Sequence, residues 1–443
     1  MFTRRQIWNL LIPLMIEQVL TSLMGTADTM MVASVGSAAI SAVSLVDSIN
    51  VLLICVFAAM ATGGGIVCAQ LLGRGERRDA SDTGGQLVLT VFAISVAVMA
   101  ALVLLREPLL RLIFGQVEAD VMEDALTYML ITALSYPFIA LYNAGAALFR
   151  VDGNSRLPML VSTIANAVNI ALNALLIYAF GMGVAGAALA TLASRVLCAV
   201  VILAQLRRPR QAIVVRDYLR IRPNFKRIWN ILAIGVPTGV ENGMFHFGKL
   251  AIQSTVSTLS TTAIAAQAMT ATLELLSGQA QIGIGLGMMT IVGQCMGAGR
   301  RDEARRSILR LTAYSEICSI VACILVALAV KPVTRIAGME PEAADMTAQL
   351  TYVICIVKPF LWTLSFTPAY GMRAAGDVRY SMILSTTTMW VCRVVISVVL
   401  IRALGFGPLG VWIGMFSDWA VRALLYTRRF LSGKWAEHQV VKG

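Results

Sequence analysis

The chain has 443 residues, of which 58% are hydrophobic and 14% are charged, and its mean hydropathy is +0.77. A soluble domain usually carries about 25% charged residues, so this composition excludes an ordinary soluble fold and indicates a membrane protein. The net charge of +12 does not indicate a nucleic-acid partner, because the arginines stand in short segments between apolar stretches.

Apolar stretches long enough to cross a bilayer recur along the whole chain. The first stretch is interpreted as an uncleaved helix and not a signal peptide, because Glu17 interrupts it and no clear cleavage site follows. We predict an all-α polytopic membrane protein with twelve transmembrane helices, at 7–33, 39–70, 86–105, 124–149, 157–180, 184–206, 229–256, 262–295, 306–330, 347–372, 380–402 and 408–430.

Basic residues concentrate in every second loop, whereas the intervening loops have few of them or mix them with acids. The basic loops contain Arg74, Arg77 and Arg78; Arg150 and Arg156; the segment 207–227; Arg300, Arg301, Arg305 and Arg306; Arg373 and Arg379; and Arg428, Arg429 and Lys434. Cytoplasmic loops carry an excess of Lys and Arg, so both termini are predicted to be cytoplasmic. We expect a multi-pass protein of the bacterial inner (plasma) membrane.

The two halves of the chain repeat each other at an offset of 223 or 224 residues. The matching positions are Pro13 and Glu17 with Pro237 and Glu241, Gly73-x-Gly75 with Gly297-x-Gly299, and Arg150-x-x-Gly153 with Arg373-x-x-Gly376. Six helices per half give both halves the same topology, related by a pseudo-two-fold axis along the membrane normal. We predict an N-lobe at 1–206 (helices 1–6), a basic cytoplasmic linker at 207–228, and a C-lobe at 229–443 (helices 7–12 and a short tail).

Carboxylates inside a bilayer cost about 3 kcal/mol on insertion scales and are functional candidates for that reason. Asp28 lies in the outer half of the first helix. Asn169 and Asn173 lie on one face of the fifth helix, and Thr191 lies in the sixth. Helix rise places all four within roughly 7–17 Å of the outer surface, where they are expected to bind Na⁺ or to hydrogen-bond a protonating carboxyl group. Alternatively, the two amides only hydrogen-bond neighbouring helices together.

The remaining polar candidates lie in the second half and at two prolines. Pro13 and Pro237 each remove a backbone hydrogen bond and are predicted to bend the first and seventh helices. We expect Glu241 and Glu274, with His246, to face a substrate cleft and attract cationic substrate. The chain has no Walker motif, no C-x-x-C pair and no catalytic cluster, so we expect neither a cofactor nor an enzymatic activity.

Together, the repeat, the glycine motifs and Asp28-Thr-Met resemble the multidrug and toxic compound extrusion (MATE) family over essentially the whole chain. The resemblance implies two lobes in a V shape around a central cleft. It also implies alternating-access export of organic, often cationic, amphiphiles in exchange for H⁺ or Na⁺.

MATE transporters similarly use a helix-1 Asp, a helix-5 Asn with a second polar residue four positions later, and a helix-6 Thr as the cation site. Asp28, Asn169, Asn173 and Thr191 match that pattern, but the second helix-5 residue is often Asp. Its replacement by Asn173 leaves the choice between H⁺ and Na⁺ open.

A second hypothesis is a lipid or lipid-linked oligosaccharide flippase of the same superfamily. It predicts a strongly cationic cleft that holds a pyrophosphate, for which Arg195, Lys249, Lys358 and Arg393 would have to converge. In either case the partners are expected to be small organic substrates and membrane lipid, and the protein is expected to be a monomer.

Overall fold

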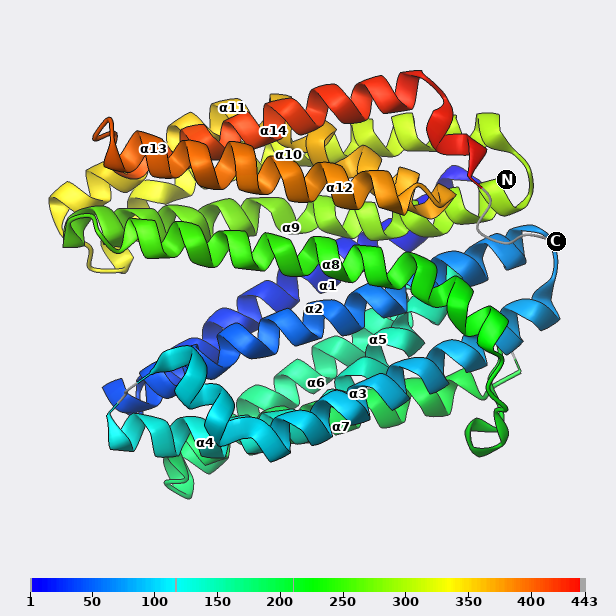
Figure 1. Ribbon diagram of the computed structural model, residues 1–443, viewed down its shortest axis with the longest axis horizontal. Helices are drawn as coiled ribbons and strands as arrows, with labels where there is room; N and C mark the ends of the chain where they lie inside the picture. Colours follow the sequence, from blue (N-terminus) through cyan, green and yellow to red (C-terminus); the bar gives the residue numbers. More distant parts are fainter. Residues whose placement is uncertain (1, 116–117, 210, 439–443) are drawn as a thin grey trace. The chain divides into compact units, whose positions relative to one another are not determined.

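The computed structural model describes residues 2–115, 118–209 and 211–438, and every regular element in these ranges is a helix (Figure 1). The elements are α1 (Arg4–Ala33), α2 (Ser37–Gly73), α3 (Arg77–Phe114), α4 (Ala119–Leu134), α5 (Tyr136–Val151), α6 (Arg156–Ala174), η1 (Leu175–Ala179), α7 (Gly183–Leu206), η2 (Tyr218–Arg220), α8 (Phe225–Val256), α9 (Thr261–Gly297), α10 (Arg301–Ile336), α11 (Pro341–Ala375), α12 (Val378–Thr388), η3 (Met389–Val395), α13 (Ile396–Arg402), α14 (Pro408–Leu431) and η4 (Lys434–Glu437).

The prediction of twelve long helices is confirmed for the described ranges, since each predicted helix corresponds to one helical segment. The fourth segment consists of α4 and α5, which meet at a bend of 41°. The fifth continues from α6 into the π-helical turn η1, and the eleventh contains the π-helical stretch η3 between α12 and α13. Pro13 and Pro237 lie inside α1 and α8, and the bends expected there stay predictions.

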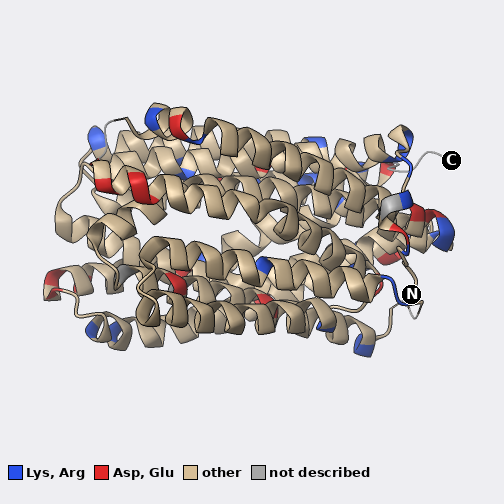
Figure 2. Cartoon of the chain, turned by 90° about the horizontal axis from the view of Figure 1, so that it is seen from below, with Lys and Arg blue, Asp and Glu red and all other residues tan. Residues whose placement is uncertain are grey.

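Nine of the described helices are long and apolar enough to cross a membrane, or ten if the bent pair α4 and α5 forms one span. Two further long helices, α8 and α14, fall outside this group. They contain the charged residues Glu241, Lys249, Asp418 and Arg422 in their sequences. Elsewhere, charged residues gather mainly toward the helix ends (Figure 2). Hydropathy therefore misses the two helices that carry the buried side chains of Glu241, Asp418 and Arg422.

The chain forms two compact units, Thr3–Gly239 and a second built mainly of Val240–Gly443. The start of α8 thus belongs to the N-terminal unit, although the repeat places the beginning of the C-lobe at residue 229. In the N-terminal unit, α2 packs against α3, α4 and α5, and α1 packs against α6. The V-shaped arrangement of the lobes and the central cleft stay predictions.

The segment between α7 and α8 is docked on the N-terminal unit by hydrogen bonds. The backbone N–H of Ala212 donates to Asp152 at 2.9 Å, and the N–H of Val214 donates to Ser81 at 3.2 Å. Burial raises the pKa of the Asp152 carboxyl, and the Ala212 N–H and the Arg77 charge oppose that rise. The predicted linker is therefore held on the N-terminal unit by hydrogen bonds.

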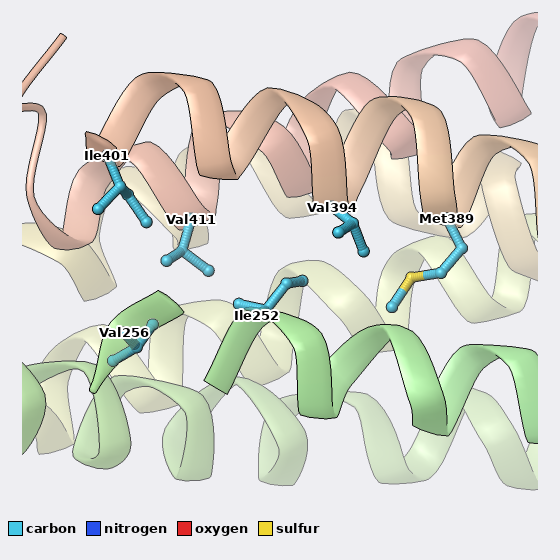
Figure 3. Close-up of a cluster of buried hydrophobic side chains, with 6 residues drawn as sticks. All are labelled: Ile252, Val256, Met389, Val394, Ile401 and Val411. Carbon is cyan, nitrogen blue, oxygen red and sulfur yellow. The ribbon is translucent and has the colours of Figure 1, made fainter. Parts of the chain in front are cut away.

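In the C-terminal unit, α11 packs against α9, α10 and α14. The end of α8 is held by an apolar cluster, shown in Figure 3, whose side chains come from α8, η3, α13 and α14. Its members are Ile252, Val256, Met389, Val394, Ile401 and Val411. Dense packing of these side chains fixes η3 next to α8.

Two glycines let α2 approach the first half of α8 within the N-terminal unit. A Cβ atom on Gly63 would lie 2.6 Å from the Gly235 backbone nitrogen and 2.9 Å from the Ile231 carbonyl oxygen. A Cβ on Gly235 would lie 3.0 Å from the Cα of Met60. Only glycine fits at this crossing, as is typical of closely packed membrane helices.

We expect Gly63→Ala to lower the thermal stability of the detergent-solubilised protein, because the added methyl group must push two backbones apart, at a cost of about 1–3 kcal/mol. Gly25→Ala is the matched control in α1, since a Cβ there meets nothing within 4 Å. That variant should keep or raise the melting temperature, because alanine favours helix by about 1 kcal/mol. Equal melting temperatures for both variants would contradict the close crossing.

Candidate functional site

The four residues predicted to form a cation site lie together in the N-terminal unit. Asp28 on α1 accepts a hydrogen bond from Nδ2 of Asn173 on α6 at 2.9 Å. Asn169, one turn earlier on α6, places its side-chain amide within 3.0 Å and 2.8 Å of the two carboxylate oxygens of Asp28. Thr191 on α7 completes the cluster. Its backbone nitrogen lies 3.2 Å from the side-chain amide atom of Asn169 that does not face Asp28. Three helices therefore converge on one carboxyl group.

The Asn169 amide can face the carboxyl group in two orientations. With its nitrogen toward Asp28, it donates to a carboxylate, and its oxygen accepts from the Thr191 N–H. With its oxygen toward Asp28, its nitrogen donates to the Thr191 hydroxyl at 3.5 Å, and Asn173 donates to its oxygen at 3.2 Å. The second orientation presents an acceptor to a protonated carboxyl or a ligand oxygen to a cation.

Asp28 differs from most other carboxylates inside the helices because it has no basic partner. Asn169 and Asn173 are buried at 5% and 2% exposure, and Asp28 is half-buried. Among the described residues, no Lys, Arg or His nitrogen lies within 4.0 Å of Asp28. Its close hydrogen-bond partners are neutral amides, as would suit a carboxyl group that exchanges a cation.

A second polar cluster, not predicted from the sequence, lies in the same unit. Asp47 on α2 accepts from Asn50 at 3.0 Å and from the Tyr128 hydroxyl at 3.3 Å. Arg195 on α7 donates to Ser135 at 2.7 Å. The i,i+3 spacing of Asp47 and Asn50 was the available signal, but their partners come from helices far along the chain.

Glu17 and Glu241, which match in the repeat, each form a buried ion pair with the arginine of the matching Arg-x-x-Gly motif. Arg150 lies 3.1 Å from Glu17, and Arg373 lies 2.8 Å from Glu241. Both glutamates are buried, at 4% and 7% exposure. The duplicated motif thus ties the first helix of each half to the fourth, and Glu241 is neutralised by Arg373.

Glu274 on α9 is paired with Lys358 on α11. Lys358 is fully buried, and its Nζ lies 2.7 Å from Glu274 Oε1 and 2.7 Å from the Ser277 hydroxyl. A fourth pair joins Arg422 to Asp418 at 2.7 Å on α14, and Arg393 in η3 lies 3.4 Å from the second oxygen of Asp418. Each of these carboxylates is compensated by at least one cation.

Glu241 and Glu274 line a cavity of ≈ 590 Å³ within the C-terminal unit. Its wall comes from α8, α9, α11, α14 and residues 385–393. His246, predicted to join the two glutamates, is not among its lining residues; its ring packs edge-on against Phe245. The structure places this cavity and the Asp28 cluster in different units, so they are two separate sites.

A metal centre built from acidic, histidine or cysteine side chains is not found, since the described residues contain no group of three such side chains able to hold an ion. Any Na⁺ at Asp28 would need the neutral oxygens of Asn169, Asn173 and Thr191 as further ligands. The eight cysteines are free thiols in this structure.

Two repeated six-helix halves with compensated charges inside their helices are typical of secondary membrane transporters. Consistently, the profile of the MatE family matches residues 13–175 and 237–399, one block in each half. The chain belongs to the MatE family of membrane transporters, which confirms the resemblance.

Relatives match along nearly the whole chain. A probable multidrug resistance protein NorM from Thermotoga maritima is 28% identical, covering 99% of this chain and 94% of that protein. An FAD transporter from Shewanella oneidensis is 23% identical, covering 86% and 83%. The solved outward-facing structure of a multidrug resistance MATE family transporter has the same fold, with a TM-score of 0.90, 20% identity and coverage of 97% and 96%.

We expect Asn173→Leu to slow gradient-driven transport by about tenfold, because a hydrogen bond to a charged group contributes about 1.5–3 kcal/mol. Asn166→Leu is the control, about two helical turns before Asn173 on α6 and outside the cluster. Initial rates in proteoliposomes at equal protein content measure the effect. Equal rates in both variants would assign Asn173 to interhelical packing alone.

Glu274→Gln should lower the free energy of unfolding by about 3–5 kcal/mol, because it leaves the buried Lys358 ammonium without its carboxylate. The double variant Glu274→Gln with Lys358→Met should recover most of that loss. Thermal unfolding of the four proteins of this cycle in one detergent measures it. If the double variant is as unstable as Glu274→Gln alone, the loss does not arise from the unpaired charge.

Proposed function

We propose that the protein is a secondary multidrug efflux antiporter that exports organic amphiphiles, cationic ones included, in exchange for H⁺ or Na⁺. One observation carries the proposal: Asp28 is a carboxyl group without a basic partner, held by Asn169 and Asn173 from α6 beside Thr191 on α7. Family membership and the multidrug names of its relatives support the class of substrate.

The coupling cation binds at Asp28. In the cation-free state, both asparagine amides donate to the carboxylate. When H⁺ or Na⁺ arrives from outside, the charge is neutralised and the Asn169 amide turns its oxygen toward the site. A single carboxylate suits either cation, because Asn173 adds an oxygen ligand and no second negative charge.

Export follows from mutual antagonism between cation and substrate. Cation binding changes the contacts that join α1 to α6, and α1 also holds Pro13 and the Glu17–Arg150 pair. If the cation favours one conformation of α1 and the substrate favours the other, binding of either ligand shifts the equilibrium between these conformations and lowers the affinity of the protein for the other ligand. Substrate then leaves on the side where the cation enters.

The driving force is sufficient for concentrative export. One proton moving down 100 mV contributes about 2.3 kcal/mol, and one pH unit adds about 1.4 kcal/mol. Together these support roughly a 500-fold gradient of a neutral substrate at 1:1 exchange. For a monovalent cationic substrate the voltage terms cancel and only the pH term remains.

The flippase hypothesis has less support. Its four cations do not form one group, because Arg195 lies in the N-terminal unit beside Ser135, whereas Lys249, Lys358 and Arg393 lie in the other unit. Lys358 is also committed to Glu274. We further propose a bacterial inner-membrane location with both termini cytoplasmic, a monomer, and no bound cofactor.

The test uses purified protein in liposomes loaded with a fluorescent cationic dye. An imposed H⁺ gradient and then a Na⁺ gradient should identify the one ion that drives dye movement in the wild type. Asp28→Asn should abolish that movement, because an amide can neither take up a proton nor bind a cation as strongly as a carboxylate.

Asp120→Asn is the matched control, since Asp120 is an exposed carboxylate in the first turn of α4. It should transport like the wild type. No dye movement under either gradient would overturn the multidrug antiport proposal. Gradient-driven movement that persists in Asp28→Asn would keep antiport and refute Asp28 as the coupling site.

A further inference from the structure

A polar pocket of ≈ 460 Å³ lies where the segment between α7 and α8 crosses the first turns of α3. Its wall comes from residues 81–86 of α3 and from the segment 214–227. All of these residues belong to Thr3–Gly239, so the pocket is contained in the N-terminal unit. Its volume falls within the range of about 300–1,000 Å³ typical of small-molecule sites.

Hydrogen bonds to α3 hold the wall of this pocket at two points. The backbone N–H of Val214 donates to the Ser81 hydroxyl at 3.2 Å. The buried side chain of Gln86 donates through Nε2 to the Arg222 carbonyl oxygen at 2.8 Å and accepts from the Asn224 N–H at 2.9 Å. Because the backbone between these points is held in place, less ordering remains to be done when a ligand binds to its side chains.

Arginines outnumber carboxylates in this pocket. Its charged lining residues are Arg216, Arg220, Arg222, Arg227, Asp82 and Asp217. Arg227 is engaged by Asp79 at 2.6 Å and lies 3.7 Å from Asp82. When Asp79 is counted with the lining residues, four arginines face three aspartates, an excess of one positive charge. This excess equals the single negative charge of a phosphodiester.

Three of the arginines are available to a ligand. Within residues 2–115, 118–209 and 211–438, the side chains of Arg216, Arg220 and Arg222 are exposed and form no ion pair. The Cα atoms of Arg220 and Arg222 are at most about 7 Å apart, because only one residue separates them. That residue, Ile221, has an extended backbone with φ −67° and ψ 114°, and side chains two positions apart on an extended backbone point to the same side. Both guanidinium groups can therefore reach one phosphate group, whose oxygens accept paired Arg hydrogen bonds.

Two exposed aromatic side chains follow the pocket directly in the chain. Phe225 and Trp229 lie one turn apart at the start of α8, with exposed fractions of 81% and 71%. Aromatic residues of this kind are enriched at the level of the lipid headgroups, where membrane helices begin and end. Since Arg222 and Asn224 come just before Phe225, the pocket is expected at the same depth.

We propose that this pocket binds a phosphate group that carries one negative charge, with Arg220 and Arg222 as its principal donors. A free phosphate and a phospholipid headgroup would bring the same chemistry. The exposed aromatic pair favours the headgroup of an anionic phospholipid, because it places the pocket at the membrane surface, where basic segments attract such lipids. The site does not depend on the exchange of cation and substrate proposed above.

Equilibrium binding distinguishes the two sources of phosphate. The full-length protein, labelled with a fluorophore at its C-terminus and held in detergent, is titrated separately with three probes. These are dihexanoylphosphatidylglycerol, dihexanoylphosphatidylcholine and inorganic phosphate, and microscale thermophoresis measures each Kd. Phosphatidylglycerol should bind saturably and about tenfold more tightly than either of the others, as expected for a charge-assisted contact made by a lipid.

The double variant Arg220→Gln with Arg222→Gln should weaken phosphatidylglycerol binding about tenfold and remove most of its preference over phosphatidylcholine. The variant with Lys at both positions keeps the charges and should retain most of that preference. Both variants should melt at the wild-type temperature, because the replaced side chains are exposed. Arg4→Gln with Arg5→Gln is the control, since it removes two exposed cations from the start of α1 in the same unit and should bind like the wild type.

Three outcomes would each overturn the proposal: equal affinities for the two lipids in the wild type, an unchanged phosphatidylglycerol affinity in the double Gln variant, or an equal loss in the control. Inorganic phosphate that binds as tightly as phosphatidylglycerol, with the same loss in the double Gln variant, would refute the lipid as the source and leave the phosphate site standing.

Discussion

The constraint on which this structure depends is that a charge inside the hydrocarbon must be compensated. A buried cation without a partner costs several kcal/mol, and in this protein ion pairs between separate helices compensate such charges. Lys358, fully buried on α11, is held by Glu274 on α9, and the Glu17–Arg150 and Glu241–Arg373 pairs join the first and fourth helices of each half. These pairs give the bundles specific contacts that apolar packing alone cannot provide. Asp28 departs from this pattern, because its close partners are neutral amides, and we propose it as the coupling site.

Duplication preserved the scaffold, while the polar sites diverged. Both halves retain the glutamate–arginine pair, and the Arg-x-x-Gly motif ends the helix that carries the arginine. At the position that matches Asn169, however, the second half has Cys392, inside a π-helical stretch that follows α12. The next residue, Arg393, lies 3.4 Å from Asp418 of α14. The second half therefore lacks the two asparagines of the proposed cation site at the matching positions.

The proposed exchange of a cation for a substrate requires the two ligands to influence each other's binding. Ligands at separate sites influence each other only through a conformational equilibrium that both bias. We propose that the charge state of Asp28 biases the packing of α1, a helix that the Glu17–Arg150 pair also joins to α5.

Sequence periodicity and charge determined much of this protein by themselves. Helix rise and i,i+4 spacing placed Asn169 and Asn173 at the depth of Asp28, and the offset of 224 residues revealed the two halves, because these relations are local or repeated. Only the tertiary structure decided which carboxylates are neutralised. Glu241 and Glu274 look alike in sequence as carboxylates within apolar helices, but each is paired with a cation from a helix far along the chain. Such long-range pairing depends on how helices pack, which no local pattern encodes, and it neutralises two carboxylates that were expected to attract cations.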